Sequence, residues 1–227
     1  MAQRVERVDE IIPIRFAVMS CTDKTGLGEF ATRLVELADD ITILSTGGTY
    51  TELHRALAAV GREGHVEQIS EYTGQPEIAG GLVKSLHHKL FLGYLTETDN
   101  PNHQEALERE GAHPIDLVVC NLYNFGSITQ DPAKDMEDAR GQIDIGGPSM
   151  IRAAAKNWLR VATIIDPSDF EPVLTEIQMN GGARYDTRRT LAARAFDHTA
   201  KYDLMIAKHL LAQTPQQGRA PYRFEPA

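Results

Sequence analysis

Two short stretches rich in hydroxyl and glycine residues, SCTDKTG at residues 20–26 and STGGT at residues 45–49, have the composition of a phosphate site. Hydroxyls, free backbone N–H groups and the positive end of a helix dipole are the groups that bind phosphate. Ordinary turn and cap chemistry would explain one such stretch, but two, one with a lysine, favour a phosphate or another anion. Neither matches the G-x-x-x-x-G-K-[ST] pattern, so we do not predict an ATPase. The candidate phosphate-binding residues are Ser20, Thr22, Lys24, Thr25, Ser45, Thr46, Gly47, Gly48 and Thr49.

A second group of residues has the types needed for acid–base chemistry. Asp144 lies between two isoleucines and precedes GGPSMIRAAAK, a stretch that predicts a helix with proline in its first turn and Lys156 near its end. Asn121 and Tyr123 follow a long apolar run. A carboxylate, a lysine and a tyrosine that meet in one pocket would form an acid–base set. Asp144 could equally be a helix cap, and Asn121 and Tyr123 could be interface residues. The spacing leaves these alternatives open.

The segment GGLVKSLHHK at residues 80–89 combines Lys84 and Ser85 with two adjacent histidines. The apolar run LFLGYL that follows it resembles a strand. Adjacent side chains of a strand point to opposite faces, so His87 and His88 would not converge on one ion. No cysteine or carboxylate stands beside them at metal-ligand spacing, and we therefore expect no metal site.

The elements that would position these residues alternate along the chain. Apolar runs predict strands at residues 15–20, 41–45, 115–123 and 160–166, and periodic apolar residues predict helices at 27–38, 50–60, 167–179 and 186–213. This alternation indicates an α/β fold with a mostly parallel sheet covered by helices on both faces. In such a sheet, ligands bind beyond the carboxyl ends of the strands, where the two phosphate-like stretches lie.

Length and composition restrict the class of protein. The 227 residues, with 42% hydrophobic and 24% charged, are ordinary for a globular chain, and we expect a charged lead-in at 1–14, one domain at 15–213 and a loose tail at 214–227. The net charge of −9 argues against nucleic acid as a partner. No apolar run is long enough for a membrane helix, and no secretory signal is evident, so we expect a cytoplasmic protein. The two cysteines, Cys21 and Cys120, fit a reducing compartment, and we expect both to be small buried residues.

Several motifs together resemble one known family. SCTDKTGLGEFATRL, STGGT, EYTGQPEIAGGLVKSLH, IDLVVCNLY, QIDIGGPSMIRAAAKN, DPSDF and RRTLAARAFDHTAKYD follow one another as in the IMP cyclohydrolase domain of the bifunctional purine-biosynthesis enzyme that also carries AICAR transformylase. The resemblance runs from about residue 16 to residue 210. It implies a methylglyoxal-synthase-like fold, a homodimer, no cofactor, and closure of formyl-AICAR to IMP. The larger transformylase domain has no counterpart in these residues, so the chain is similar to a free-standing cyclohydrolase or a detached half, supplied by a separate transformylase.

The resemblance also implies roles for individual residues. Asp144 would be the base or hydrogen-bond acceptor at the carboxamide, and Lys84 would polarise the formyl oxygen. Tyr123 and Lys156 would form a proton relay. Backbone N–H groups near Ile145 and Gly146 would stabilise the oxyanion. The residues expected at the base or ribose are Ser85, Asn121, Ile145, Gly146 and Gly147.

Four positions depart from the family pattern: Leu82 replaces an arginine, His88 and Asn124 each replace a proline, and Phe91 replaces a histidine. Loss of a cation near an anionic nucleotide should weaken binding, and loss of prolines should loosen the loops that carry Lys84 and Tyr123. These departures motivate one alternative, a diverged paralogue that cyclises a related ribonucleotide in a specialised nucleoside pathway. A second alternative is a non-catalytic anion-sensing module.

Overall fold

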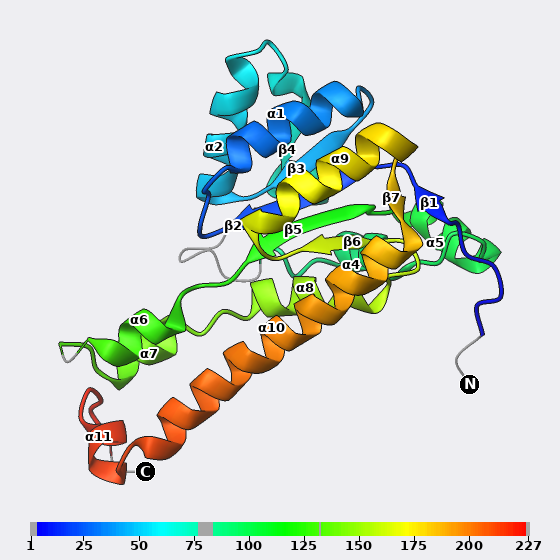
Figure 1. The fold of residues 1–227 in the computed structure, drawn as a ribbon. Helices are drawn as coiled ribbons and strands as arrows, with labels where there is room; N and C mark the ends of the chain where they lie inside the picture. Colours follow the sequence, from blue (N-terminus) through cyan, green and yellow to red (C-terminus); the bar gives the residue numbers. More distant parts are fainter. Residues whose placement is uncertain (1–3, 77–83, 132, 226–227) are drawn as a thin grey trace.

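A five-stranded parallel sheet forms the centre of the protein, with the strand order β4-β3-β2-β5-β6 (Figure 1). The computed structural model describes residues 4–76, 84–131 and 133–225. The sheet strands are β2 (Phe16–Cys21), β3 (Thr42–Ser45), β4 (Val66–Gln68), β5 (Leu117–Asn121) and β6 (Ala162–Ile164), and β1 (Ile11–Ile12) and β7 (Ala183–Arg184) form a separate antiparallel pair. The α/β class and the parallel sheet predicted from the sequence are confirmed.

Helices cover both faces of this sheet, as Figure 1 shows. Their bounds are α1 (Leu27–Leu37), α2 (Gly47–Ala58), α3 (Ile69–Thr73), α4 (His88–Leu95), α5 (Pro101–Glu110), α6 (Phe125–Gln130), α7 (Met136–Gly141), α8 (Gly146–Lys156), α9 (Phe170–Asn180), α10 (Tyr185–Ala212) and α11 (Pro215–Arg219), with 3-10 turns at Glu63–His65 and Pro167–Asp169. Among the described residues, none of these helices combines the length and the apolar character needed to cross a lipid bilayer.

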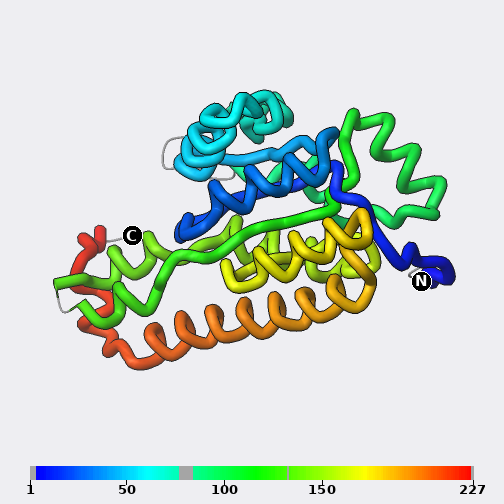
Figure 2. The backbone as a smooth tube through the Cα atoms, turned by 45° about the horizontal axis from the view of Figure 1, so that its top comes forward, coloured from blue at the N-terminus to red at the C-terminus, as the bar shows by residue number. Residues whose placement is uncertain are grey.

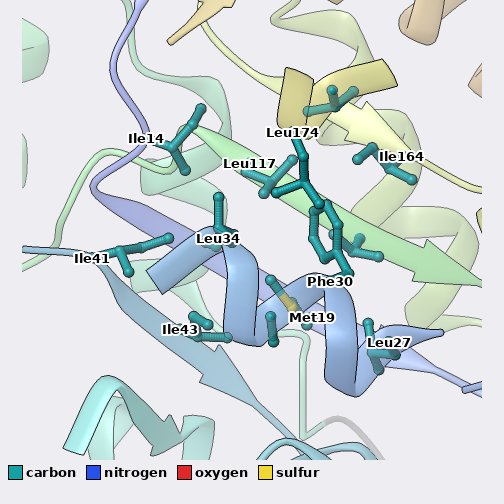
Figure 3. Packing of buried hydrophobic residues seen from close by; sticks show 14 of the residues in the cluster. Ile14, Met19, Leu27, Phe30, Leu34, Ile41, Ile43, Leu117, Ile164 and Leu174 are labelled. Carbon is teal, nitrogen blue, oxygen red and sulfur yellow. The ribbon is translucent and has the colours of Figure 1, made fainter. Parts of the chain in front are cut away.

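The core has two layers because successive strand side chains point to opposite faces of the sheet. On one face, Met19 and Ile43 pack against the apolar stripe of α1, where Phe30 stacks on Phe170 of α9 with ring centroids 4.4 Å apart (Figure 3). On the other face, the neighbouring strand residues pack on α4, α8 and the first half of α10. The sheet is therefore buried on both sides, which agrees with its nearly continuous apolar strands.

The second half of α10 extends past the sheet toward α6, α7 and α11 (Figure 2). There, Phe125 of α6 and Ala139 of α7 pack against Tyr202 of α10 in a small separate apolar cluster. The long helix thus connects the sheet to the segment between β5 and α8, which carries several candidate site residues.

One expectation from the sequence is wrong, and two elements lie outside the domain expected at 15–213. The run LFLGYL is helical and lies in α4, where Leu90 and Tyr94 are buried at a spacing of one helical turn. The lead-in contributes β1, and Ile12 in it is only 3% exposed. The tail at 214–227 begins with α11, whose N-terminus has a capping box formed by Thr214 and Gln217.

A buried arginine joins the two ends of the domain. Arg188 of α10 is 0% exposed, and its guanidinium donates only to backbone carbonyls. One nitrogen, Nη2, reaches Asp9 O at 2.6 Å and Leu159 O at 3.0 Å. Other bonds go to the carbonyls of Trp158, Glu10 and Ala183. Because the guanidinium has five donors in a fixed fork, it satisfies carbonyls from three separate segments at once.

We predict that Arg188→Met lowers the free energy of unfolding by at least about 3 kcal/mol, because it leaves several buried carbonyls without donors. Urea denaturation followed by circular dichroism measures the change. The matched control is Arg189→Met, since Arg189 is the next residue of the same helix and is exposed. Equal stability of the two variants would contradict this role for Arg188.

Candidate active site

The register of the sheet brings three loops to one edge. Met19 of β2 lies beside Ser45, the last residue of β3, and Cys21, the last residue of β2, lies beside Asn121, the last residue of β5. The three strands thus end at one edge of the sheet, with β3 ending two residues before the other two. A cavity of about 510 Å³ opens there. The residues that line it are Ser20, Cys21, Thr22, Lys24, Thr46, Gly48, Thr49, Lys84, Ser85, Leu86, Cys120, Asn121, Tyr123, Gly141, Ile143, Asp144, Ile145, Gly146 and Gly147.

One end of this cavity is suited to an anion. Helix α2 begins at Gly47, and the N–H groups of Gly47 and Gly48 precede the first bonds of the helix, which run from Thr49 N and Tyr50 N to Thr46 O. A Cβ placed on Gly47 would lie 3.1 Å from Lys84 Nζ, and one placed on Gly48 would lie 3.9 Å from Lys24 Nζ. Two ammonium groups therefore lie beside the positive end of a helix dipole, an arrangement that favours phosphate.

Not all the predicted phosphate residues face this end. Ser45 is 0% exposed, and its hydroxyl donates to Met19 O at 2.7 Å. The Thr25 hydroxyl donates to Asp23 Oδ1 at 2.7 Å, within its own loop. Thr49 Oγ1 accepts from Cys21 N at 2.9 Å and so joins α2 to β2. Six of the nine predicted residues line the cavity: Ser20, Thr22, Lys24, Thr46, Gly48 and Thr49. The other three, Thr25, Ser45 and Gly47, are not among its lining residues.

Asn121 holds the first loop in place. Its Oδ1 accepts from the backbone N–H groups of Thr22, at 2.7 Å, and Asp23, at 3.0 Å. Its Nδ2 donates to Asp23 O at 2.7 Å. The side chain lines the cavity, but its amide is engaged with the loop backbone, which differs from the predicted contact with the base or ribose.

At the other end, Asp144 precedes the first turn of α8. Its Oδ1 accepts from Gly147 N at 2.9 Å, and the Gly146 N–H also hydrogen-bonds to the carboxylate. Burial raises the pKa of Asp144, an effect that these two backbone N–H groups oppose. Asp144 is therefore both a helix cap and a cavity residue. The Gly146 N–H, expected from the resemblance to serve an oxyanion, contacts Asp144 here.

Gly147 is required sterically at this point. A Cβ added to it would lie 2.5 Å from Asp144 Oδ2 and 2.7 Å from Leu122 Cδ2, closer than such atoms approach one another. A side chain at position 147 would displace the Asp144 carboxylate. Glycine at this position therefore helps to fix the orientation of Asp144.

The segment with Lys84 and Ser85 spans the cavity. Lys84 Nζ lies beside Gly47 at the phosphate end, whereas a Cβ on Gly146 would lie 2.6 Å from Ser85 Oγ at the Asp144 end. The sequence-based prediction put Lys84 at the base end, and its ammonium is instead at the phosphate end in this structure. The exposed side chains of Tyr123 and Ile145, at 47% and 62%, complete the rim.

Lys156 does not join this group. It is exposed at the last position of α8, ten residues after Gly146, which corresponds to about 15 Å along the helix axis. It is not among the residues that line the cavity. The structure therefore gives Tyr123 and Lys156 no common pocket within one chain, and their predicted relay is not formed here.

The cysteines and histidines have structural roles. Cys21 and Cys120 are buried and free, as expected; burial raises the pKa of Cys21 to about 12 and also raises that of Cys120, so both remain neutral thiols. His87 caps α4, its Nδ1 accepting from Lys89 N at 3.2 Å. Within the described ranges, no group of three or more His, Cys, Asp or Glu side chains has the geometry of a metal site.

Three of the four departures from the family pattern lie in the described residues. His88 is the exposed first residue of α4, and Phe91 packs edge-on against Tyr94 with ring centroids 5.6 Å apart. Asn124 caps α6 through Oδ1, which accepts from Ser127 N at 3.3 Å, so it replaces the rigidity of a proline with a hydrogen bond. Leu82 lies outside the described residues.

Comparisons with known proteins agree with the fold and with the motifs. A family model described as "MGS-like domain" matches residues 26–149, and one described as "AICARFT/IMPCHase bienzyme" matches residues 154–225. The bifunctional purine biosynthesis protein PurH of Neisseria meningitidis is 44% identical over 219 residues, which are 93% of this chain and 40% of that protein. PurH of Enterococcus faecalis is 46% identical over 197 residues, which are 87% of this chain and 37% of that protein.

The chain thus spans about 40% of the length of the curated relatives it matches. Among solved structures, one described as "Crystal structure of ForH" superposes with a TM-score of 0.73 and 31% sequence identity. The match covers 87% of this chain and 99% of the ForH chain.

We predict that Lys24→Met and Lys84→Met each weaken binding of ribose 5-phosphate by about 10- to 100-fold, because each removes a charged donor from the start of α2. Isothermal titration calorimetry at fixed ionic strength measures the change. Lys208→Met, on the exposed surface of α10, is the control for the loss of one positive charge. If all three variants bind equally, the anion lies elsewhere.

Proposed function

We propose that this chain, which belongs to the MGS-like domain family, is an IMP cyclohydrolase. Its C-terminal part matches the AICARFT/IMPCHase model, and the PurH protein of Neisseria meningitidis matches nearly the whole chain. Its substrate would be formyl-AICAR and its product IMP, formed in purine nucleotide biosynthesis. The observation that carries the proposal is a single cavity with an anion-binding end at α2 and a partly buried carboxylate, Asp144, at the start of α8.

The reaction requires one bond-forming step and the loss of one water. The carboxamide nitrogen attacks the formyl carbon, and the formyl oxygen becomes a carbinolamine hydroxyl. That hydroxyl then leaves as water. Its two hydrogens come from the carboxamide nitrogen and from the formamido nitrogen, and the C=N bond of the pyrimidine ring remains. The enzyme must therefore accept a proton from a weakly acidic amide and deliver one to the departing oxygen.

Asp144 is suited to the first task. Burial raises its pKa and so makes the carboxylate a stronger base, while the Gly146 and Gly147 N–H groups fix its direction. We assign polarisation of the formyl oxygen to Lys84, whose ammonium lies beside Gly47 in this structure and would turn toward Asp144 when the nucleotide is bound. Tyr123 on the rim would contribute a hydroxyl for proton transfer. The phosphate would occupy the start of α2 and thereby orient the base toward Asp144.

A specialised substrate is the second candidate. The replacements at His88, Phe91 and Asn124 flank the segments that carry Lys84 and Tyr123. ForH, which is covered over 99% of its length at 31% identity, is similar in extent to this chain. The higher identity to the PurH proteins, 44% over 219 residues, favours formyl-AICAR. Assay of formyl-AICAR beside analogues altered in the five-membered ring separates the two candidates.

Three finer statements belong to the same proposal. The chain would act as a homodimer, in the cytoplasm, on formyl-AICAR supplied by a transformylase. The resemblance of the motifs to the bifunctional family supports each of them, and light scattering of the purified protein tests the first.

We predict that Asp144→Asn lowers kcat about 10²- to 10⁴-fold, the usual contribution of a general base, while IMP binds within a few-fold of its wild-type affinity. Absorbance at the wavelength where IMP and formyl-AICAR differ measures the turnover. The pH dependence of kcat tests whether the group acts in its deprotonated form. A carboxylate base acts only when deprotonated, so activity should rise with pH through a pKa above the usual range of aspartate, and this limb should vanish in the variant.

Asp203→Asn is the matched control, because Asp203 is exposed on α10 and its loss changes the net charge equally. No turnover of formyl-AICAR by the wild-type protein at saturating concentration would overturn the cyclohydrolase proposal. Full activity of Asp144→Asn would overturn the assignment of the base.

A further inference from the structure

A tyrosine from the far half of α10 reaches the segment that carries Asp144. The Tyr202 hydroxyl accepts a hydrogen bond from Asp144 N at 2.8 Å and donates one to Gln142 O at 3.2 Å. Tyr202 is 58 residues away from Asp144 in the sequence and only 5% exposed. One hydroxyl therefore satisfies a donor and an acceptor of the same short connection.

The connection needs such a partner because it belongs to neither neighbouring helix. It comprises residues 142–145, between α7 and α8. The N–H groups of Gln142 and Ile143 still bond back to α7, at Ala139 O and Arg140 O. Asp144 N is the next backbone donor, and it turns instead to the Tyr202 hydroxyl. The backbone direction at Asp144 is thus set from outside the connection.

The ring of Tyr202 is itself fixed. It packs in the cluster with Phe125 and Ala139, and its centroid lies 6.5 Å from that of Phe125 in an edge-on arrangement. A hydroxyl on a ring held by α6 and α7 has little freedom to follow a moving loop. It acts as a fixed point for the backbone of the connection.

We propose that Tyr202 is a positioning residue for Asp144. Its hydroxyl fixes the peptide that precedes the carboxylate, so that Oδ1 meets the Gly147 N–H while Asp144 lines the cavity. The consequence for rate rests on the proposed function, in which Asp144 is the base. The effect of Tyr202 on the environment of the Asp144 carboxylate does not depend on the proposed function.

The hydroxyl and the ring can be separated experimentally. Tyr202→Phe keeps the packing with Phe125 and removes both hydrogen bonds. Freed of its acceptor, the Asp144 peptide can rotate, and the carboxylate moves toward solvent. Because burial is the main cause that raises the pKa of Asp144, that pKa should then fall toward the usual range of aspartate. The Gly146 and Gly147 N–H groups lower the pKa of Asp144, so a weaker contact with them opposes this fall, but burial is the larger cause and sets the net direction.

The experiment has two readouts. The first is the titration of the Asp144 carboxyl carbon by NMR in protein labelled at aspartate, assigned with Asp144→Asn. The second is kcat and KM for formyl-AICAR across pH. We expect Tyr202→Phe to lower the pKa of Asp144, to move the acid limb of the kcat profile to lower pH, and to reduce kcat about 10- to 100-fold with KM within about threefold, the pattern of a misplaced group.

Tyr222→Phe is the matched control. The substitution also removes a hydroxyl hydrogen bond, from Tyr222 to Glu137 Oε2 of α7 at 2.7 Å, but Tyr222 is neither part of the connection nor a cavity-lining residue. We expect it to leave both readouts unchanged. If Tyr202→Phe lowers only the thermal stability and leaves the Asp144 titration as in the wild type, its role is purely structural and the inference is overturned. If the titration shifts but neither protein turns over formyl-AICAR, the positioning role stands and the proposed function fails.

Discussion

The register of β2 between β3 and β5 is the constraint on which the rest of the site depends. The backbone pairing places Cys21 beside Asn121 and Met19 beside Ser45, so three parallel strands deliver their loops to the same edge of the sheet. A slip of one residue would turn every side chain of a strand to the other face, and both apolar layers would be lost. Because the core fixes the register, it also fixes the distance between the anion-binding end and the opposite end of the cavity.

Polar side chains at this edge divide into two kinds. Ser45, Thr49 and Asn121 use their hydrogen bonds to join loops to strands, whereas Lys24, Lys84 and Asp144 keep charged atoms at the cavity. The hydrogen bonds of the first group fix the loops that carry the charged side chains. These loops therefore lose less conformational entropy when a ligand binds.

The sequence predicted the parallel sheet apart from β4, the helices α1, α2, α8, α9 and α10, and the loops after β2 and β3, because those depend on local periodicity and on the edge rule for parallel sheets. It did not distinguish a helix from a strand in the short apolar run that forms α4, where periodicity alone is ambiguous. It could not identify Arg188 or Tyr202, whose partners are 178 and 58 residues away. It also placed Lys156 in the site from resemblance, while the length of α8 puts it at the opposite end of that helix.

The central claim is that one cavity holds a purine nucleotide with its phosphate at the start of α2 and its base at Asp144. A crystal structure of the protein with IMP tests it most directly. We predict phosphate oxygens within hydrogen-bond distance of the Gly47 or Gly48 N–H groups and the Lys24 ammonium, with the six-membered ring of the purine facing the Asp144 carboxylate. A phosphate bound away from α2, or a purine that faces away from Asp144, would contradict the account.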